Sequence, residues 1–251
     1  MRRDVQAIIL MLIGGATLRI TIGDTYLNYV KESMRPFLLI SGGLLLLLGI
    51  LALVDVLRAS KIPAARAAAD AELEDELDGV GHDHGHDHSR GPRAAWFLLL
   101  PVLAIFLIAP PALGAFSAAR ESTNAIPDLS EAKAPPLPPG DPVPVRVSDY
   151  IGRAVWDDGL TLEGRNVEMT GFVTPDPEGG WWLTRMSMAC CAADAFASRI
   201  KAVDVPELPE NTWVTVIGTW IPGGGTQSAD AIPLVQVESF IEVPQPREPY
   251  E

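Results

Sequence analysis

The sequence has very little cysteine, and its histidines are confined to one short segment. Its two cysteines are the neighbours Cys190 and Cys191, and all four histidines lie between positions 82 and 88. Adjacent cysteines could close only a strained disulfide ring, so a framework of ordinary structural disulfides is excluded. Because residues 118–251 contain no histidine, a histidine-based triad or a histidine-rich metal centre is excluded from the C-terminal half.

Basic residues are also scarce in that half. Residues 118–251 hold nine Lys and Arg against twenty Asp and Glu, which contributes −11 of the formal net charge of −13. Such a charge repels phosphate backbones, so we expect no nucleic-acid partner. No phosphate loop, Ser-His-Asp set or pair of catalytic carboxylates is evident, and we therefore expect a protein that is not an enzyme.

Long hydrophobic runs, by contrast, are prominent. Three of them approach the roughly 20 apolar residues that a helix needs to cross a bilayer: Val5–Ile22, Phe37–Leu57 and Ala94–Phe116. The first follows Arg2 and Arg3 but lacks a small-residue cleavage site, which argues against a signal peptide. The sequence predicts a multi-pass protein of the plasma membrane, with two spans within residues 1–57 and a third within 94–117.

The distribution of Lys and Arg predicts the orientation of these spans. The N-terminus and the loop 58–93 carry more Lys and Arg than the short loop between the first two spans. By the positive-inside rule the loop 58–93 is cytoplasmic, and three spans then place the C-terminal domain outside the cytoplasm.

Residues 118–144 are rich in proline and predict a semi-rigid spacer. After them, short runs of alternating apolar residues recur between turns, which is typical of β-strands. They are 167–173, 181–188, 200–205, 213–221 and 234–243, with a helix expected at Ala192–Ala197. The fold class is therefore a membrane α-helical N-terminal region plus a small all-β domain over 145–251, an OB-like barrel, with a β-sandwich as the alternative.

Cys190 and Cys191 allow three interpretations. They could be small buried core residues, a redox-active dithiol, or part of a soft-metal site. Thiolates favour Zn²⁺ or Cu(I), and Asp194 could add an oxygen ligand. Met186 and Met188 would share a strand face with Cys190, which is more typical of core packing than of a thioether copper site.

A second candidate metal site lies in the acidic loop 58–93. Its ligands would be His82, His84, His86 and His88, which alternate along an extended chain. Histidine-rich tracts of this kind are typical of metal-binding segments, although a merely solvated acidic linker is the alternative. In the second span, Gly42, Gly43 and Gly49 favour close packing against another helix, such as one of a membrane partner.

The chain resembles the YcgQ-like permease-subunit family. The resemblance rests on the blocks Leu183–Arg185, Cys190–Ala195, Trp213–Thr219 and Pro246–Tyr250, together with Tyr29 before Pro36 in the N-terminal region. It implies a two-component membrane assembly with a multispanning permease subunit as partner, and metal ions as suspected substrates.

We therefore expect an accessory subunit of a membrane permease that handles a soft divalent metal, zinc or another soft transition metal, through its extracytoplasmic domain. Two alternatives remain open. One is an extracytoplasmic thiol redox protein that uses the pair Cys190–Cys191. The other is an OB-type ligand-binding module, with Trp181 or Trp182 on an aromatic binding face.

Overall fold

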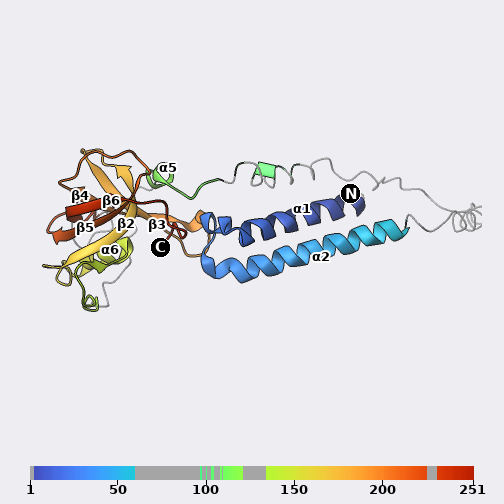
Figure 1. The fold of residues 1–251 in the computed structure, drawn as a ribbon, viewed down its shortest axis with the longest axis horizontal. Coiled ribbons are helices and arrows are strands. Elements are labelled where there is room, and N and C mark those ends of the chain that lie inside the picture. The colour runs from blue at the N-terminus through green and yellow to red at the C-terminus, as the bar shows by residue number, and fades with distance from the viewer. Residues whose placement is uncertain are drawn as a thin grey trace, which may run out of the picture. The chain divides into compact units, whose positions relative to one another are not determined.

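The computed structural model of the chain contains two compact units (Figure 1). The described residues are 3–59, 97, 100, 103–104, 108, 110–120, 134–224 and 231–251. One unit contains the N-terminal helices. The other contains the β-domain together with Tyr26–Glu32, the segment that connects those two helices.

The helical unit contains α1 (Arg3–Ile22) and α2 (Arg35–Ala59), which run antiparallel and in contact (Figure 1). Glycines allow this approach. A side chain at Gly42 would meet Leu18, and one at Gly49 would meet Met11 of α1, whereas one at Gly43 would meet nothing within 4 Å. Gly42 and Gly49 thus pack two helices of the same chain, and of the three only Gly43 remains open to another protein.

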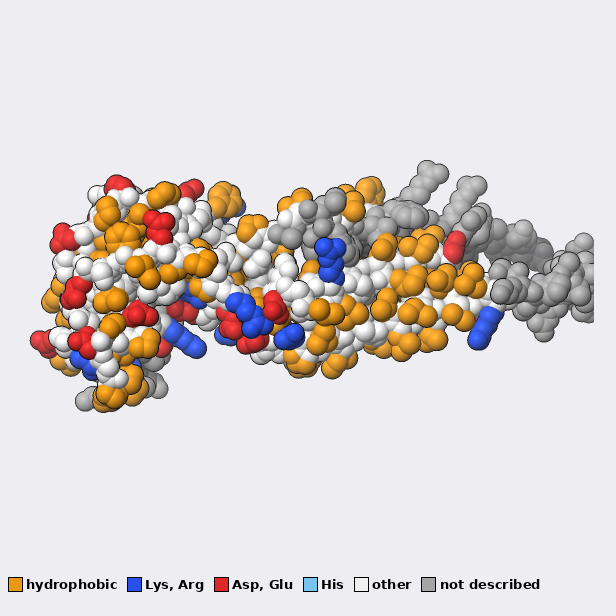
Figure 2. Space-filling model, in the orientation of Figure 1, with side chains coloured by type: hydrophobic (Ala, Val, Ile, Leu, Met, Phe, Trp, Pro, Cys, Tyr) orange, Lys and Arg blue, Asp and Glu red, His pale blue; other side chains and the backbone are white. Residues whose placement is uncertain are grey.

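Both helices are long and apolar enough to cross a membrane. The apolar stretches are Asp4–Ile22 and Glu32–Arg58. In the most apolar 18 residues of each, only 28% and 11%, respectively, are buried. A core helix of a soluble protein would bury most of its apolar side chains, whereas here they line the outside of both helices (Figure 2). A bilayer is the solvent that suits such a surface. The predicted third span lies mostly outside the described residues and stays a prediction.

The β-unit is a small closed barrel. Its strands are β1 (Val143–Pro144), β2 (Asn166–Pro175), β3 (Trp181–Ser187), β4 (Phe196–Val203), β5 (Trp213–Ile221) and β6 (Leu234–Glu242). The order is β1-β2-β3-β4-β6-β5, and a further pairing of β2 with β5 closes the ring. All pairings within the ring are antiparallel except that of β4 with β6. Five strands joined in this way form an OB-like barrel, as the sequence predicts, rather than a sandwich.

The barrel interior continues into helix α6 (Val147–Trp156), which the strand pattern did not reveal. The helix buries Val147, Tyr150, Ile151, Ala154 and Val155 in the same cluster as the inward-facing strand residues. These buried apolar residues recur every three to four positions, which is the spacing expected of a helix that is buried on one side. The core of the unit therefore lies between the barrel strands and α6.

Two predicted boundaries around the barrel were wrong. Only Ala192–Asp194 form a 3-10 turn where a longer helix was expected, and Ala195 is extended because β4 already begins at Phe196 to pair with β3. Part of the proline-rich segment contacts the β-unit. Arg153 and Arg165 donate hydrogen bonds to its carbonyl groups, and Leu137 packs on the core. An extended proline-rich backbone leaves its carbonyls free to accept such bonds.

Candidate metal-binding site

The loop between β3 and β4 is organised around the carboxylate of Asp194. Its Oδ1 accepts a hydrogen bond from the backbone N–H of Ala189 at 2.9 Å. Its Oδ2 accepts from the N–H groups of Cys190 and Cys191 at 3.0 and 3.3 Å, and from the thiol of Cys190 at 2.9 Å. A carboxylate that gathers several N–H donors fixes the loop, so both cysteines project from a defined backbone.

Cys190, Cys191 and Asp194 form a compact set of potential ligands. One ligand atom from each, two Sγ atoms and a carboxylate oxygen, lie within 4.8 Å of one another. Cys190 is exposed, Cys191 is partly exposed, and both are free thiols. The core-packing interpretation of the pair therefore fails. Soft thiolates with one carboxylate suit Zn²⁺ or a similar ion, with a coordination position left for water or another chain.

The hydrogen bond between Cys190 and Asp194 changes the proton affinity of both groups. It is the largest of the causes that raise the pKa of the Cys190 thiol to about 11, because an ionised thiol would lose this bond and face the carboxylate; a hydrogen bond with Cys191 adds to the rise. The bond from Cys190 also lowers the pKa of Asp194 to about 2, with help from the backbone donors. At neutral pH the pair thus holds a thiol and a carboxylate, and a cation that binds the thiolate must displace one proton.

The segment between α1 and α2 is hydrogen-bonded to this loop. Val30 forms an isolated antiparallel β-bridge with Cys191. The Lys31 N–H donates to the carbonyl of Cys190 at 3.1 Å, and the Ala192 N–H donates to the carbonyl of Tyr29 at 2.7 Å. The Lys31 ammonium also donates to the carbonyl of Met188 at 3.2 Å. The backbone of the cysteine pair is therefore tied directly to the connection between the two apolar helices.

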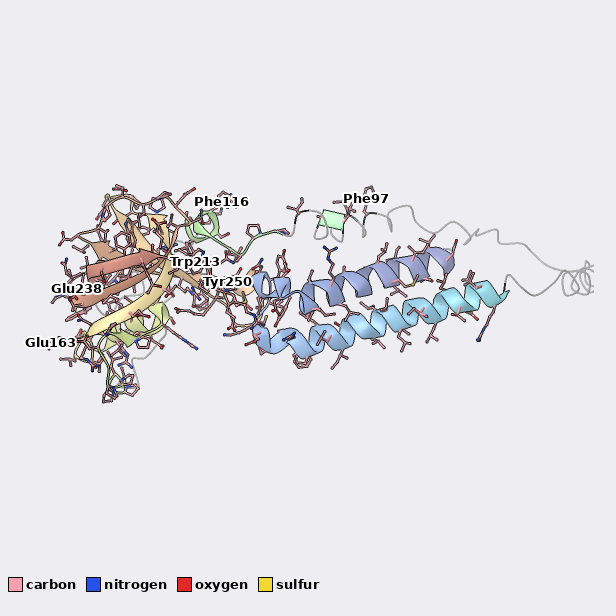
Figure 3. The ribbon with its side chains drawn as sticks, in the orientation of Figure 1. Phe97, Phe116, Glu163, Trp213, Glu238 and Tyr250 are labelled. Carbon is pink, nitrogen blue, oxygen red and sulfur yellow. The ribbon has the colours of Figure 1, made fainter. Side chains whose placement is uncertain are left out.

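The C-terminal residues hold the same segment from another side. Tyr250 is labelled in Figure 3. Its hydroxyl donates to the carbonyl of Asn28 and accepts from the N–H of Leu113, both at 2.9 Å. Tyr250 pairs with Met186 in a parallel β-bridge. The block Pro246–Tyr250, noted in the sequence only for its resemblance, is thus part of the framework of the site.

The other predicted site residues lie elsewhere. Met186 and Met188 are almost fully buried, at 1% and 3% exposure, which matches the core stripe rather than a thioether site. Trp181 is also buried and donates its ring N–H to the carbonyl of Pro206, so it cannot serve as an aromatic binding platform. The histidines 82–88 lie outside the described residues, and their metal affinity stays a prediction.

Comparison with family models assigns the chain to a family. The model of the DUF1980 N-terminal domain matches residues 5–124, and that of the DUF1980 C-terminal domain matches residues 157–251. The chain belongs to the DUF1980 family. The membership agrees with the YcgQ-like resemblance, and the C-terminal model covers all five strands of the ring as well as the cysteine loop. No curated protein and no solved structure matches the chain.

Proposed function

We propose that this DUF1980 protein is a non-enzymatic accessory subunit of a two-component membrane permease, and that it handles a soft divalent ion at Cys190, Cys191 and Asp194. The observation that carries the proposal is the convergence of their three ligand atoms within 4.8 Å on a loop tied to the α1–α2 connection. The ion is the cargo of the assembly, and zinc is the first candidate. The multispanning permease is the expected partner, and the barrel lies outside the cytoplasm.

The hydrogen bonds suggest how ion binding at the cysteine loop changes the position of the segment that joins α1 and α2. The Asp194 carboxylate accepts hydrogen bonds from three N–H groups and one thiol. An ion that recruits this carboxylate and both thiols competes with those bonds and shifts the loop backbone. Because the carbonyl of Cys190 and the N–H of Ala192 are bonded to the α1–α2 connection, the shift reaches the segment that joins the two helices.

The raised pKa of Cys190 argues against the thiol-redox alternative. A thiol that attacks a disulfide reacts as the thiolate, and reactive cysteines usually have a lowered pKa. A Cys190 pKa of about 11 leaves very little thiolate at neutral pH. A cation offsets this by binding the thiolate directly, so the same feature suits reversible, proton-coupled metal binding.

The test is Zn²⁺ binding by the full-length protein in detergent under reducing conditions. To remove the second candidate site, His82, His84, His86 and His88 are replaced by alanine. Competition with a chromophoric chelator should give one bound Zn²⁺.

In that background, Cys190→Ser and Cys191→Ser should each lower the affinity by at least about 100-fold, more than outer partners of a metal site usually cost. Asp194→Ala should have a smaller effect, and Glu238→Ala, which removes an exposed carboxylate of β6, should have none. Equal binding by all of these variants would refute the site. Restoring the four histidines should add a second, weaker site if the loop also binds metal.

A further inference from the structure

Arg185 is a buried cation with unused hydrogen-bond donors. It stands near the end of β3 and is 8% exposed. Its Nη2 donates to the carbonyl of Glu248 at 2.8 Å, and its guanidinium lies 4.8 Å from the ring centre of Trp213. Its Nε and Nη1 have no hydrogen-bond partner within the described part of the chain. Buried donors without acceptors are costly and uncommon, so their presence requires an explanation.

A cavity of about 420 Å³ has Arg185 in its wall. It occupies the seam where β2 and β3 separate, because β2 pairs with β3 only from Phe172 onward. Before that point the outer face of β2 contributes Glu168 and Thr170 to the cavity wall. The remaining walls come from the α1–α2 connection, the residues before α6 and the C-terminal residues, all of them parts of the same compact unit.

The charges around the cavity are nearly balanced. Its three cationic side chains are those of Lys31, Arg146 and Arg185. Its four carboxylates are those of Glu32, Glu168, Glu248 and Glu251. The last is already engaged, because it accepts hydrogen bonds from the N–H groups of Val147 and Ser148 at the start of α6. The lining side chains thus carry one more negative than positive charge, so the favourable contact for an anion is the local one with Arg185. Phosphate or citrate, which carry more charge, are repelled more strongly than a singly charged group.

We propose that this cavity binds a small monocarboxylate whose carboxylate group accepts hydrogen bonds from Arg185. Guanidinium groups are well suited to carboxylates, and a bond in this buried position is stronger than one at the surface. The carboxylate could belong to a simple organic acid or to an amino acid, whose ammonium group would then meet the wall carboxylates. The site is separate from the cysteine loop in its ligands and in its chemistry.

Calorimetric titration of the full-length protein in detergent tests the proposal, with acetate, glycine, inorganic phosphate and citrate as probes. Acetate or glycine should bind at one saturable site. Arg185→Gln should weaken that binding by about 10- to 100-fold, the range expected for a buried hydrogen bond to a charged group. Arg165→Gln is the matched control, because this arginine bonds to the carbonyls of Pro138 and Gly140 and does not line the cavity.

A second variant tests monocarboxylate binding if Arg185→Gln does not fold. Arg146→Glu reverses an exposed charge at the cavity wall, and a glutamate is compatible with the start of α6. It should weaken monocarboxylate binding at least severalfold, and unchanged affinity would overturn the proposal. So would the lack of saturable binding, or tighter binding of phosphate or citrate than of acetate and glycine.

The remaining probes identify the source of the carboxylate and separate this site from the metal site. Tighter binding of glycine than of acetate identifies an amino acid as the ligand, and equal binding identifies a simple organic acid. Cys190→Ser combined with Cys191→Ser should leave monocarboxylate binding unchanged. Loss of binding in that double variant would contradict a separate site, whereas failure of the metal site alone leaves monocarboxylate binding intact.

Discussion

Replacing Asp194 by asparagine should make the neighbouring thiol more acidic. In a Cys191→Ser background Cys190 is the chain's one thiol, so its titration can be followed without overlap. Asparagine keeps a side-chain oxygen that can accept the loop N–H bonds but removes the negative charge. The hydrogen bond to Asp194 is the largest cause of the raised Cys190 pKa, and its charge opposes ionisation as well. The substitution should therefore lower the pKa of Cys190.

The structure sets the size of the effect. The Cys190 pKa of about 11 stands two units above its ordinary value of 9.0, and each unit is a factor of ten in the thiolate population at neutral pH. Cys191 contributes part of this shift and is absent from the background. We therefore expect Asp194→Asn to lower the pKa by roughly one unit and to raise the thiolate population about tenfold.

The assay is alkylation of the folded protein by iodoacetamide as a function of pH. Because a more acidic thiol is also a weaker nucleophile, the tenfold gain in thiolate should appear as a gain of about threefold in rate at pH 7. The midpoint of the pH profile should move down by about one unit. Asp204→Asn is the control, since that exposed carboxylate bonds to Gln236. An unchanged or higher midpoint in the Asp194 variant would refute the reasoning.

Four further predictions concern the metal site, the Tyr250 bridge, the helix surface and the topology. Zn²⁺ affinity should rise by up to about 100-fold for each pH unit between 6 and 8, because binding to the thiolates of both cysteines displaces two protons; a flat profile in a competition titration would contradict this. Tyr250→Phe should lower the free energy of unfolding by about 1–3 kcal/mol in chemical denaturation, since a hydroxyl that joins two backbone groups is lost, and unchanged stability would count against that bridge. Gly43→Leu should weaken co-purification with the proposed permease partner while Gly42→Leu destabilises the helix pair itself; equal recovery of the complex would exclude the Gly43 face. A cysteine at Ser130 should react with an impermeant reagent in intact cells and one at Ala69 should not, in a chain lacking the native thiols, and the reverse pattern would invert the topology.

The barrel was predictable because parts of its strands, above all the first half of β2 and most of β5, alternate between buried and less buried residues. Val167, Met169 and Val173 occur at odd positions of β2 and are buried together, and the Asp176–Gly180 turn joins β2 to β3 as a hairpin. Alternation of period two needs no tertiary information. Trp213–Ile221 was predicted to the residue for the same reason.

The framework of the candidate site was not predictable in this way. The cysteine pair and Asp194 could be selected from their spacing, but their connection to Tyr29, Val30 and Lys31 joins residues about 160 positions apart. Backbone hydrogen bonds of this kind use groups that every residue has, so no residue type marks them. The burial of Arg185 could not be predicted from the sequence either, because a lone arginine in a strand is ordinarily exposed.

The central claim is that the two thiols and the carboxylate bind one soft ion together. X-ray absorption at the zinc edge tests it most directly, on full-length protein whose four histidines are replaced by alanine and which is loaded with one equivalent of Zn²⁺. The account predicts two sulfur neighbours at about 2.3 Å, with oxygen completing the shell, and one sulfur neighbour after Cys190→Ser or Cys191→Ser. A spectrum with only oxygen or nitrogen neighbours in the protein that retains both cysteines would contradict the account.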